Sequence, residues 1–590
     1  MTQVNAPNVE KPFLNTRFED RRHFFRLLRK DSVFALRHIL YFGAAALRKG
    51  RNRFRCYLTS SHRGNKRVPD WINVDAVASK VDAITVQKLH LPDFDCLQSL
   101  VWNDDANMFP IGDDDPEVYF ELNRWGYLLP AALGNAKGNE IGRVLEWIEK
   151  HKDKTSAAWE PYSACERVCN LLTYISVRRD ELALPDLEAA VARFVVDTVA
   201  WILRHIEYYG EGNTNNHVLN NARALVMAGT VLGDNAICAA GIATFRRFLP
   251  LMVGPGGFLR ERSSHYQLIV AGWVLDSWHF SQARYGSTNT DVLFLKEAAQ
   301  RMVEASGLLV DEEGNLLALV GDVSPDLLPR ASVLRLLSLH SEFGPIRSRQ
   351  VGYAAIVDDW FRLSRGEQCV IGNFPSGVFP TDFPTHGHSD FTSFVWRSGR
   401  VELLADLGRY RYISDDISDM QTNSVGHNVP LVDGFSPLTE SLSATGTWLP
   451  TPYASATLSA VVNRNAICLE HDGFARATNV IVHRRTIELT AEGLEVIDDF
   501  SGDGMAEIRL HWNFGVDFTL FDSEAMTTEG KSGQLELSVE GMISPQTISG
   551  RGWRSECYGA IAPSLYVDII GNVMLPAVIS TKFTYKICVE

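Results

Sequence analysis

The chain has 590 residues, of which 45% are hydrophobic and 22% charged, and its formal net charge is −14. This length exceeds a single ordinary hydrophobic core, so two or three domains are expected, and the composition excludes a disordered protein. The negative net charge argues against general nucleic-acid binding.

The N-terminal segment, residues 1–70, differs from the rest in charge. It holds sixteen Lys or Arg against five Asp or Glu, a net charge of +11 that leaves −25 for the remainder. The pattern FFRLLRKDSVFALRHILYFGAAALRKG predicts a basic amphipathic helix over about residues 21–55. We expect this helix to pack on the body of the protein, with weak contact to an anionic membrane surface as the alternative.

Targeting signals are not visible in the sequence. The start MTQVNAPNVEKPF lacks the pattern of a signal peptide, and the most apolar early stretch, residues 39–47, is too short to span a bilayer. The nine cysteines are scattered and form no CxxC pair, as is usual in a reducing compartment. A cytoplasmic location is therefore the default expectation, and a periplasmic one is the alternative.

Two different periodicities divide the remaining sequence. Residues 71–365 show repeated helical patterns, such as VARFVVDTVAWILRHIEYY and YQLIVAGWVLDSWHFSQARY, which predict stacked helical hairpins in a solenoid or an (α/α) toroid. Residues 366–590 alternate apolar and polar residues, as in VIVHRRTIELT and AEIRLHWNFG, which predicts an antiparallel β-sandwich. The predicted fold class is multidomain α+β.

A cluster of histidines and carboxylates lies in the predicted β region. His386 and His388 are separated by one residue, so in an extended segment their side chains point the same way. Asp406 and His427 follow within about forty residues. Imidazole nitrogen and carboxylate oxygen suit a divalent ion, and a histidine beside it can exchange protons with a substrate. The alternative is a polar loop whose histidines satisfy backbone groups.

Two further segments carry polar side chains at predicted helix starts. Asn216 and His217 end the run GNTNNH before the helix VLNNARALVMAGTVL, where they form either a simple cap or an anion-receptive corner. Tyr266 follows the turn GPGGF and the segment RERSSH. Taken alone, Tyr266 is most simply a half-buried helix tyrosine.

Five segments then occur together and in order: NNHVLNNARALVMAGTVL, GGFLRERSSHYQL, THGHSDFTSFVWRSGRVELLADLGRYRY, SVGHNVPLVDG and GWRSECYGAIAPSL. Through them the chain resembles the heparinase II/III family of polysaccharide lyases, from about residue 120 to the C-terminus. The resemblance implies an N-terminal (α/α) toroid over residues 71–365 and a β-sandwich over residues 366–590. Residues 1–70 resemble the N-terminal helices of members encoded near bacterial surface-polysaccharide genes.

The resemblance also implies roles for individual residues. Asn216 would contact the substrate carboxylate, and Tyr266 and His386 would transfer protons. The implied substrate-binding residues are His217, Glu261, Arg262, Tyr410 and Tyr412. The implied metal ligands are His388, Asp406 and His427. The expected ion is zinc, with a structural role. No organic cofactor is expected. The expected partner is an acidic polysaccharide.

The expected reaction is β-elimination beside a uronic acid, in which the proton on C5 leaves before the bond to O4 breaks. Whether His386 or Tyr266 is the base depends on the sugar epimer, so the sequence leaves both open. One alternative is a glycoside hydrolase that uses Glu160 and Glu261 as acid and base. Another is a non-catalytic glycan-binding protein that has kept the fold.

Overall fold

The computed structural model describes residues 67, 69–82, 84, 89–91, 115–133, 139–179, 182, 184–210, 214–311, 316–324, 354–378, 386–413, 415–437, 441–442, 448–449, 455–461 and 464–587. The basic helix predicted over residues 21–55 lies outside them. Within these ranges, no helix combines the length and apolar character needed to cross a bilayer.

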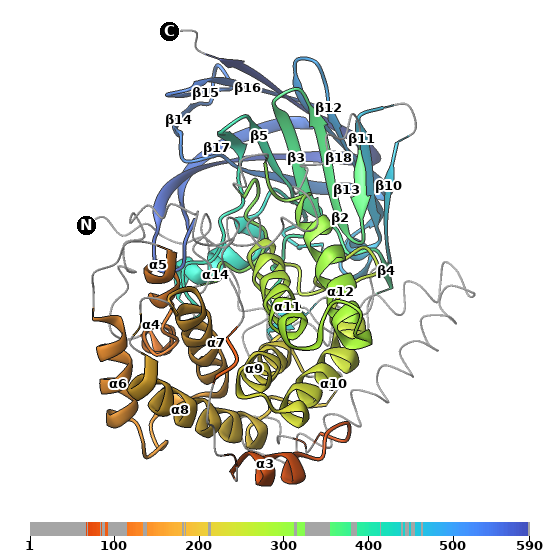
Figure 1. Ribbon diagram of the computed structural model, residues 1–590. Coiled ribbons are helices and arrows are strands. Elements are labelled where there is room, and N and C mark those ends of the chain that lie inside the picture. The colour runs from red at the N-terminus through yellow and green to blue at the C-terminus, as the bar shows by residue number, and fades with distance from the viewer. Residues whose placement is uncertain are drawn as a thin grey trace.

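Helices fill the N-terminal part of the described chain and gather at one end of the molecule (Figure 1). They are α3 (Val74–Asp82), α4 (Pro116–Leu122), α5 (Leu128–Leu133), α6 (Glu140–Lys150), α7 (Pro161–Val177), α8 (Leu184–Arg204), α9 (His217–Leu232), α10 (Asn235–Met252), α11 (Ser264–Tyr285) and α12 (Thr290–Ser306). The consecutive pairs α7–α8, α8–α9, α9–α10 and α11–α12 pack against each other, and α9 also contacts α7 and α11. Every residue of α9 from Val218 to Leu232 is buried, so this helix forms the centre of the domain.

The α9–α10 hairpin shows how local sequence sets this packing. Helix α9 ends at Gly233, whose φ of +72° is a left-handed conformation that favours glycine. Asp234 then caps α10 by accepting from the backbone N–H groups of Ala236 and Ile237. Gly229 lies against the backbone of Cys238, where a Cβ would come within 2.5 Å. The two helices therefore approach closely only because glycine stands at this position.

Antiparallel strands make up the C-terminal part of the described chain. A five-stranded sheet has the order β1-β2-β3-β5-β6, with bounds Ala355–Val357, Trp360–Arg365, Gln368–Asn373, Val395–Ser398 and Val401–Leu404. The larger sheet follows the order β14-β15-β16-β18-β13-β12-β11-β10-β4, and β17 and β7 pair with β18 and β13. In that order, the nine strands span Phe518–Asp522, Thr527–Gly530, Gly533–Glu540, Ala562–Ile587, Gly493–Asn513, Val480–Leu489, Ala466–His471, Ser455–Ala460 and Gly377–Val378. Strand β17 spans Ile543–Arg554, and β7 spans Pro430–Val432. A short pair joins β8 (Ser441–Leu442) and β9 (Trp448–Leu449).

The two large sheets face each other across an apolar core. Phe361 and Trp396 of the smaller sheet belong to the same buried cluster as Ile487 and Ile508 of the larger one. A separate apolar cluster joins the helical domain to the smaller sheet, where the rings of Phe258 and Trp360 stack at 5.1 Å. The predicted fold class, a helical domain of hairpins followed by an antiparallel β-sandwich, is confirmed.

Strands begin before residue 366, where the sequence pattern places the end of the helical region. Strands β1 and β2 form a hairpin whose turn includes Asp358, with a φ of +50°. The Asp358 carboxylate accepts from the backbone N–H groups of Gly256 and Phe258, so the hairpin is held to the glycine turn that precedes α11. The segment from residue 355 therefore belongs structurally to the β-sandwich.

A buried charged network inside the sandwich predicts a large loss of stability. The Asp498 carboxylate on β13 accepts from Arg485 and His483 on β12, and all three side chains are fully buried. Asp498→Ala leaves the Arg485 charge uncompensated, which should lower the free energy of unfolding by about 3–5 kcal/mol. Urea denaturation measures this change. The control is Arg484→Ala, which removes an exposed pair with Glu470 and should cost less than about 1 kcal/mol.

Candidate functional site

The predicted site residues come from both domains and meet where the helical domain contacts the β-sandwich. Tyr266 lies in the first turn of α11, which begins because the Ser263 side chain accepts from the Tyr266 N–H. Its ring stacks on the imidazole of His386, with centroids 3.5 Å apart and an interplanar angle of 6°. The Tyr266 hydroxyl lies 2.8 Å from the hydroxyl of Tyr412. Two predicted proton-transfer groups and one predicted substrate-binding group are therefore in direct contact.

Tyr412 is held firmly beside Tyr266. Its backbone N–H donates to the hydroxyl of Tyr558, which in turn donates to the Asp115 carboxylate at the start of α4. The Arg409 guanidinium lies 5.0 Å above the Tyr412 ring. Burial raises the pKa of Tyr412 well above its ordinary value, so this phenol keeps its proton.

Asn216 stands at the N-cap of α9 and is fully buried. Its backbone N–H donates to Glu261 Oε1 at 2.9 Å, and Glu261 Oε2 lies 3.5 Å from His386 Nε2. Glu261 thus links the Asn216 corner to His386. Among the described residues, neither the Nδ2 nor the Oδ1 atom of Asn216 has a hydrogen-bond partner. A buried amide without partners is costly, and such groups gather at functional sites.

His217 follows Asn216 and is only partly buried. Its Nδ1 lies 2.8 Å from Glu207 Oε1, and Asn221 Nδ2 donates to the other Glu207 oxygen. Burial opposes the charged imidazole, but the Glu207 carboxylate outweighs it and raises the pKa of His217 to about 9. His217 is therefore cationic at neutral pH and provides the positive charge beside Asn216.

The pKa of His217 should fall when Glu207 is replaced by Gln, because burial opposes the charge and only the smaller effects of Glu160 and Glu261 then offset it. We expect a pKa clearly below the wild-type value of about 9, measured by NMR of the histidine Cε1 proton and assigned with a His217→Gln variant. In the wild type, the ion pair between His217 and Glu207 makes its full contribution to the free energy of unfolding below about pH 6.5. That contribution is lost as the pH rises through about 9 and His217 loses its proton. An unchanged titration in Glu207→Gln would contradict the role given to Glu207.

Asp322 is a central residue that sequence reasoning missed. Its Oδ2 accepts from His386 Nδ1 at 3.0 Å, and its Oδ1 accepts from His388 Nε2 at 2.9 Å. Arg409 Nη1 lies 3.3 Å from the same Oδ1. Although burial opposes ionisation, Arg409 and the two histidines hold the pKa of Asp322 well below its usual range. In the sequence only a Gly-Asp pair marks Asp322, and such a pair does not distinguish it from an ordinary turn residue.

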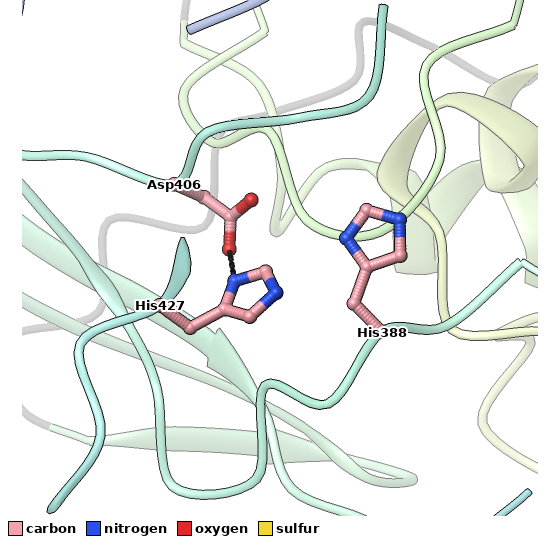
Figure 2. Close-up of side chains that lie close together, drawn as sticks. All are labelled: His388, Asp406 and His427. Carbon is pink, nitrogen blue, oxygen red and sulfur yellow. Dashed lines mark hydrogen bonds and ion pairs between the residues drawn. The ribbon is translucent and has the colours of Figure 1, made fainter. Parts of the chain in front are cut away.

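The three predicted metal ligands lie together and are buried. One ligand atom from each of His388, Asp406 and His427 falls within 4.8 Å of the others. Figure 2 shows Asp406 bonded to one ring nitrogen of His427, at 2.8 Å, and a ring nitrogen of His388 facing this pair. Burial opposes ionisation of Asp406, but His427 lowers the pKa of this carboxyl, so it presents a negative charge.

These residues fit a divalent metal ion. Within the described part of the chain, His388 Nδ1 and His427 Nε2 are buried without a hydrogen-bond partner. Such atoms are lone-pair donors that a metal satisfies, and a set of two imidazoles and one carboxylate suits a transition metal. Asp322 accepts from the other nitrogen of His388, as carboxylates commonly do behind metal-binding histidines.

Two predicted substrate-binding residues have other surroundings. Arg262 is buried, with a φ of +57°, and its Nη1 lies 3.9 Å from Asp390 Oδ1. Tyr410 bonds to Asp415 at the N-cap of the short helix α14 (Asp416–Thr422), and Arg411 bonds to the same carboxylate. Contact of either residue with a substrate stays a prediction.

Comparison with known proteins agrees with the observed fold. Residues 352–581 match the family model described as heparinase II/III-like, C-terminal. The crystal structure of heparinase III superposes with a TM-score of 0.63 at 15% identity, covering 95% of this chain and 91% of that one. Heparan sulfate lyase HepC from Pedobacter heparinus gives 0.53 at 12% identity, covering 97% and 92%. None of the curated proteins is similar enough in sequence to match.

The structural likenesses establish a shared fold over nearly the full length of both chains. The family match covers the β-sandwich and includes His386, the three metal-ligand candidates and Tyr412. Residues 352–581 are thus similar to the heparinase II/III-like C-terminal domain, and the chain shares its fold with these lyase structures.

Proposed function

We propose that this protein is a polysaccharide lyase that cleaves a uronic-acid-containing polysaccharide by β-elimination. The observation that carries the proposal is the continuous set of contacts from Asn216 through Glu261 and His386 to Tyr266 and Tyr412. Asn216, His386 and Tyr266, drawn from both domains, are thereby linked through one chain of contacts. The relatives of this fold include proteins named heparinase III and heparan sulfate lyase, which supports the assignment.

The corner formed by Asn216 and His217 would hold the uronate carboxylate. Removal of the C5 proton adds negative charge beside that carboxylate, which is the main barrier to the reaction. The Asn216 amide has no internal partner in the described structure and can donate to a carboxylate oxygen, while the cationic His217 offsets its charge. Both groups therefore stabilise the charge that develops as the proton leaves.

Tyr266 and His386 would then move the protons. Their rings are in contact, so one substrate position can reach both the phenol and the imidazole. Asp322 accepts from His386 Nδ1, which leaves Nε2 as the nitrogen available to a substrate. Tyr266 would return a proton to the leaving O4 oxygen. The sugar epimer decides which of the two groups takes the C5 proton.

Glycoside hydrolysis by Glu160 and Glu261 has less support. The Glu160 carboxylate caps α7 by accepting from the backbone N–H groups of Tyr162 and Ser163. Glu261 accepts from the backbone of Asn216 and lies beside His386. Both carboxylates thus serve the local structure, and an elimination makes use of Tyr266 and His386.

Incubation with heparan, chondroitin, alginate and bacterial exopolysaccharides tests the proposed reaction. A β-elimination creates an unsaturated uronate, so ultraviolet absorbance should rise with each cleavage. New reducing ends without that rise would indicate a hydrolase instead. Binding without either signal would favour the non-catalytic alternative.

We further propose zinc as the ion held by His388, Asp406 and His427, where it would fix the loop that carries His386. Metal removal by a chelator should then lower thermal stability and activity together, and added zinc should restore both. Free zinc at about 100 times its dissociation constant stabilises a protein by about 2.7 kcal/mol, which calorimetry resolves. The control is Asp406→Asn, whose melting temperature should depend much less on zinc. Lost activity with unchanged melting would contradict a structural role.

A further inference from the structure

We propose that Asp322 is a positioning residue that orients the proton-transfer histidine and a metal-binding histidine with one carboxylate. The inference rests on the proposed function for the role of His386, and on the metal-ligand geometry for the role of His388. It concerns a residue from the segment between the helical domain and the β-sandwich.

The contacts of the Asp322 side chain divide between its two oxygens. Oδ2 holds His386 through Nδ1 at 3.0 Å, and Oδ1 holds His388 through Nε2 at 2.9 Å. Each bond fixes which nitrogen of the ring carries hydrogen, and therefore which nitrogen is left to act. For His386 the remaining nitrogen is Nε2, on the side of Glu261. For His388 it is Nδ1, which has no hydrogen-bond partner among the described residues.

The backbone of Asp322 is fixed as firmly as its side chain. Its N–H donates to the carbonyl oxygen of His386, and its carbonyl accepts from the hydroxyl of Ser263, the cap of the helix that carries Tyr266. The preceding Gly321 has a φ of +74°, and a Cβ there would come within 2.6 Å of the carbonyl oxygens of Arg262 and His386. Asp322 is thus bonded to the loop of His386, to the helix start of Tyr266 and to a metal-ligand candidate.

This geometry requires a side chain at position 322 with two accepting oxygens. An asparagine side chain has one accepting oxygen and one donating nitrogen, so it can accept from only one of the two histidines. The other histidine would face an N–H group and turn away. A single Asp322→Asn change should therefore disturb the proton-transfer group, the metal site or both, without removing either histidine.

The experiment measures zinc affinity and steady-state kinetics of Asp322→Asn in the full chain. We expect zinc affinity, from competition with a chromophoric chelator, to fall about 10–100-fold. At saturating zinc we expect kcat to fall about 10–100-fold with little change in KM, because the substrate carboxylate is held by other residues. A merely structural role would lower the amount of folded enzyme but would leave kcat per folded molecule and zinc affinity unchanged.

Asp276→Asn is the matched control. Asp276 is a buried carboxylate on α11 that pairs with Arg223 and contacts neither histidine. It should lose thermal stability while keeping zinc affinity and kcat. If Asp322→Asn does not fold, Asp322→Glu keeps the carboxylate but moves it by one methylene, and both losses are again expected.

Wild-type zinc affinity and kcat in either folded Asp322 variant would overturn the inference. The zinc measurement also separates this inference from the proposed function, since it needs no substrate. If the wild type cleaves no uronate polymer, the lyase proposal fails. A loss of zinc affinity in the variant would still support the role of Asp322 in orienting His388.

Discussion

Tyr266→Phe should lower kcat by about 10²–10⁴-fold, the range that general acid–base groups contribute. The variant loses only the hydroxyl, which lies 2.8 Å from Tyr412 Oη, while its ring keeps the stacking on His386. KM should change little, because the proposed carboxylate contacts belong to Asn216 and His217. Initial rates from ultraviolet absorbance, over a range of substrate concentrations, separate the two constants.

Two other tyrosines provide controls for this variant. Tyr412→Phe removes the hydrogen bond to Tyr266 but leaves the phenol of Tyr266 in place, so the loss should be about 5–10-fold, as for one neutral hydrogen bond. Tyr285→Phe changes the far end of the same helix, where the hydroxyl bonds to Asn235, and should leave kcat unchanged. Normal turnover by Tyr266→Phe would remove Tyr266 from the mechanism.

The architecture was largely predictable because two periodicities are strong in this sequence. Helical patterns mark α8, α9, α11 and α12, and alternation marks β12, β13 and β16. The start of the sandwich was harder to place, because β1 and β2 are short and β2 is buried on both faces at Trp360 and Phe361. A short apolar run of this kind has no clear period, so sequence alone cannot separate it from a helix end.

The site was predictable where its residues are close in sequence. His386 and His388 were expected to reach one site, and both bond to the same carboxylate. That carboxylate, Asp322, lies 64 and 66 residues earlier in the chain, and no spacing rule links such distant positions. Glu207, which sets the charge of His217, and Tyr558, which holds Tyr412, were missed for the same reason: each acts through a contact that only the folded chain creates.

Asn216→Ala should lower kcat/KM by about 10²–10³-fold, the usual cost of removing one donor to a developing negative charge. Its effect on stability should be unusual. The amide is fully buried, and within the described structure neither of its polar atoms has a hydrogen-bond partner, so the wild type bears a desolvation cost that Ala removes. The melting temperature should therefore stay the same or rise, while activity falls. Calorimetry and initial rates measure the two effects.

Asn123→Ala gives the opposite result and is the control. The Asn123 side chain accepts from the indole of Trp147 and donates to the carbonyl of Tyr119, so its loss leaves a partly buried indole N–H unpaired. This variant should lose about 1–3 kcal/mol of stability and keep its turnover. If Asn216→Ala instead lost stability and kept full activity, the amide would be a structural cap of α9. In Asn216→Ala, activity and stability should change in opposite directions. The unpaired amide serves the substrate, but burying it without a partner lowers the stability of the wild type.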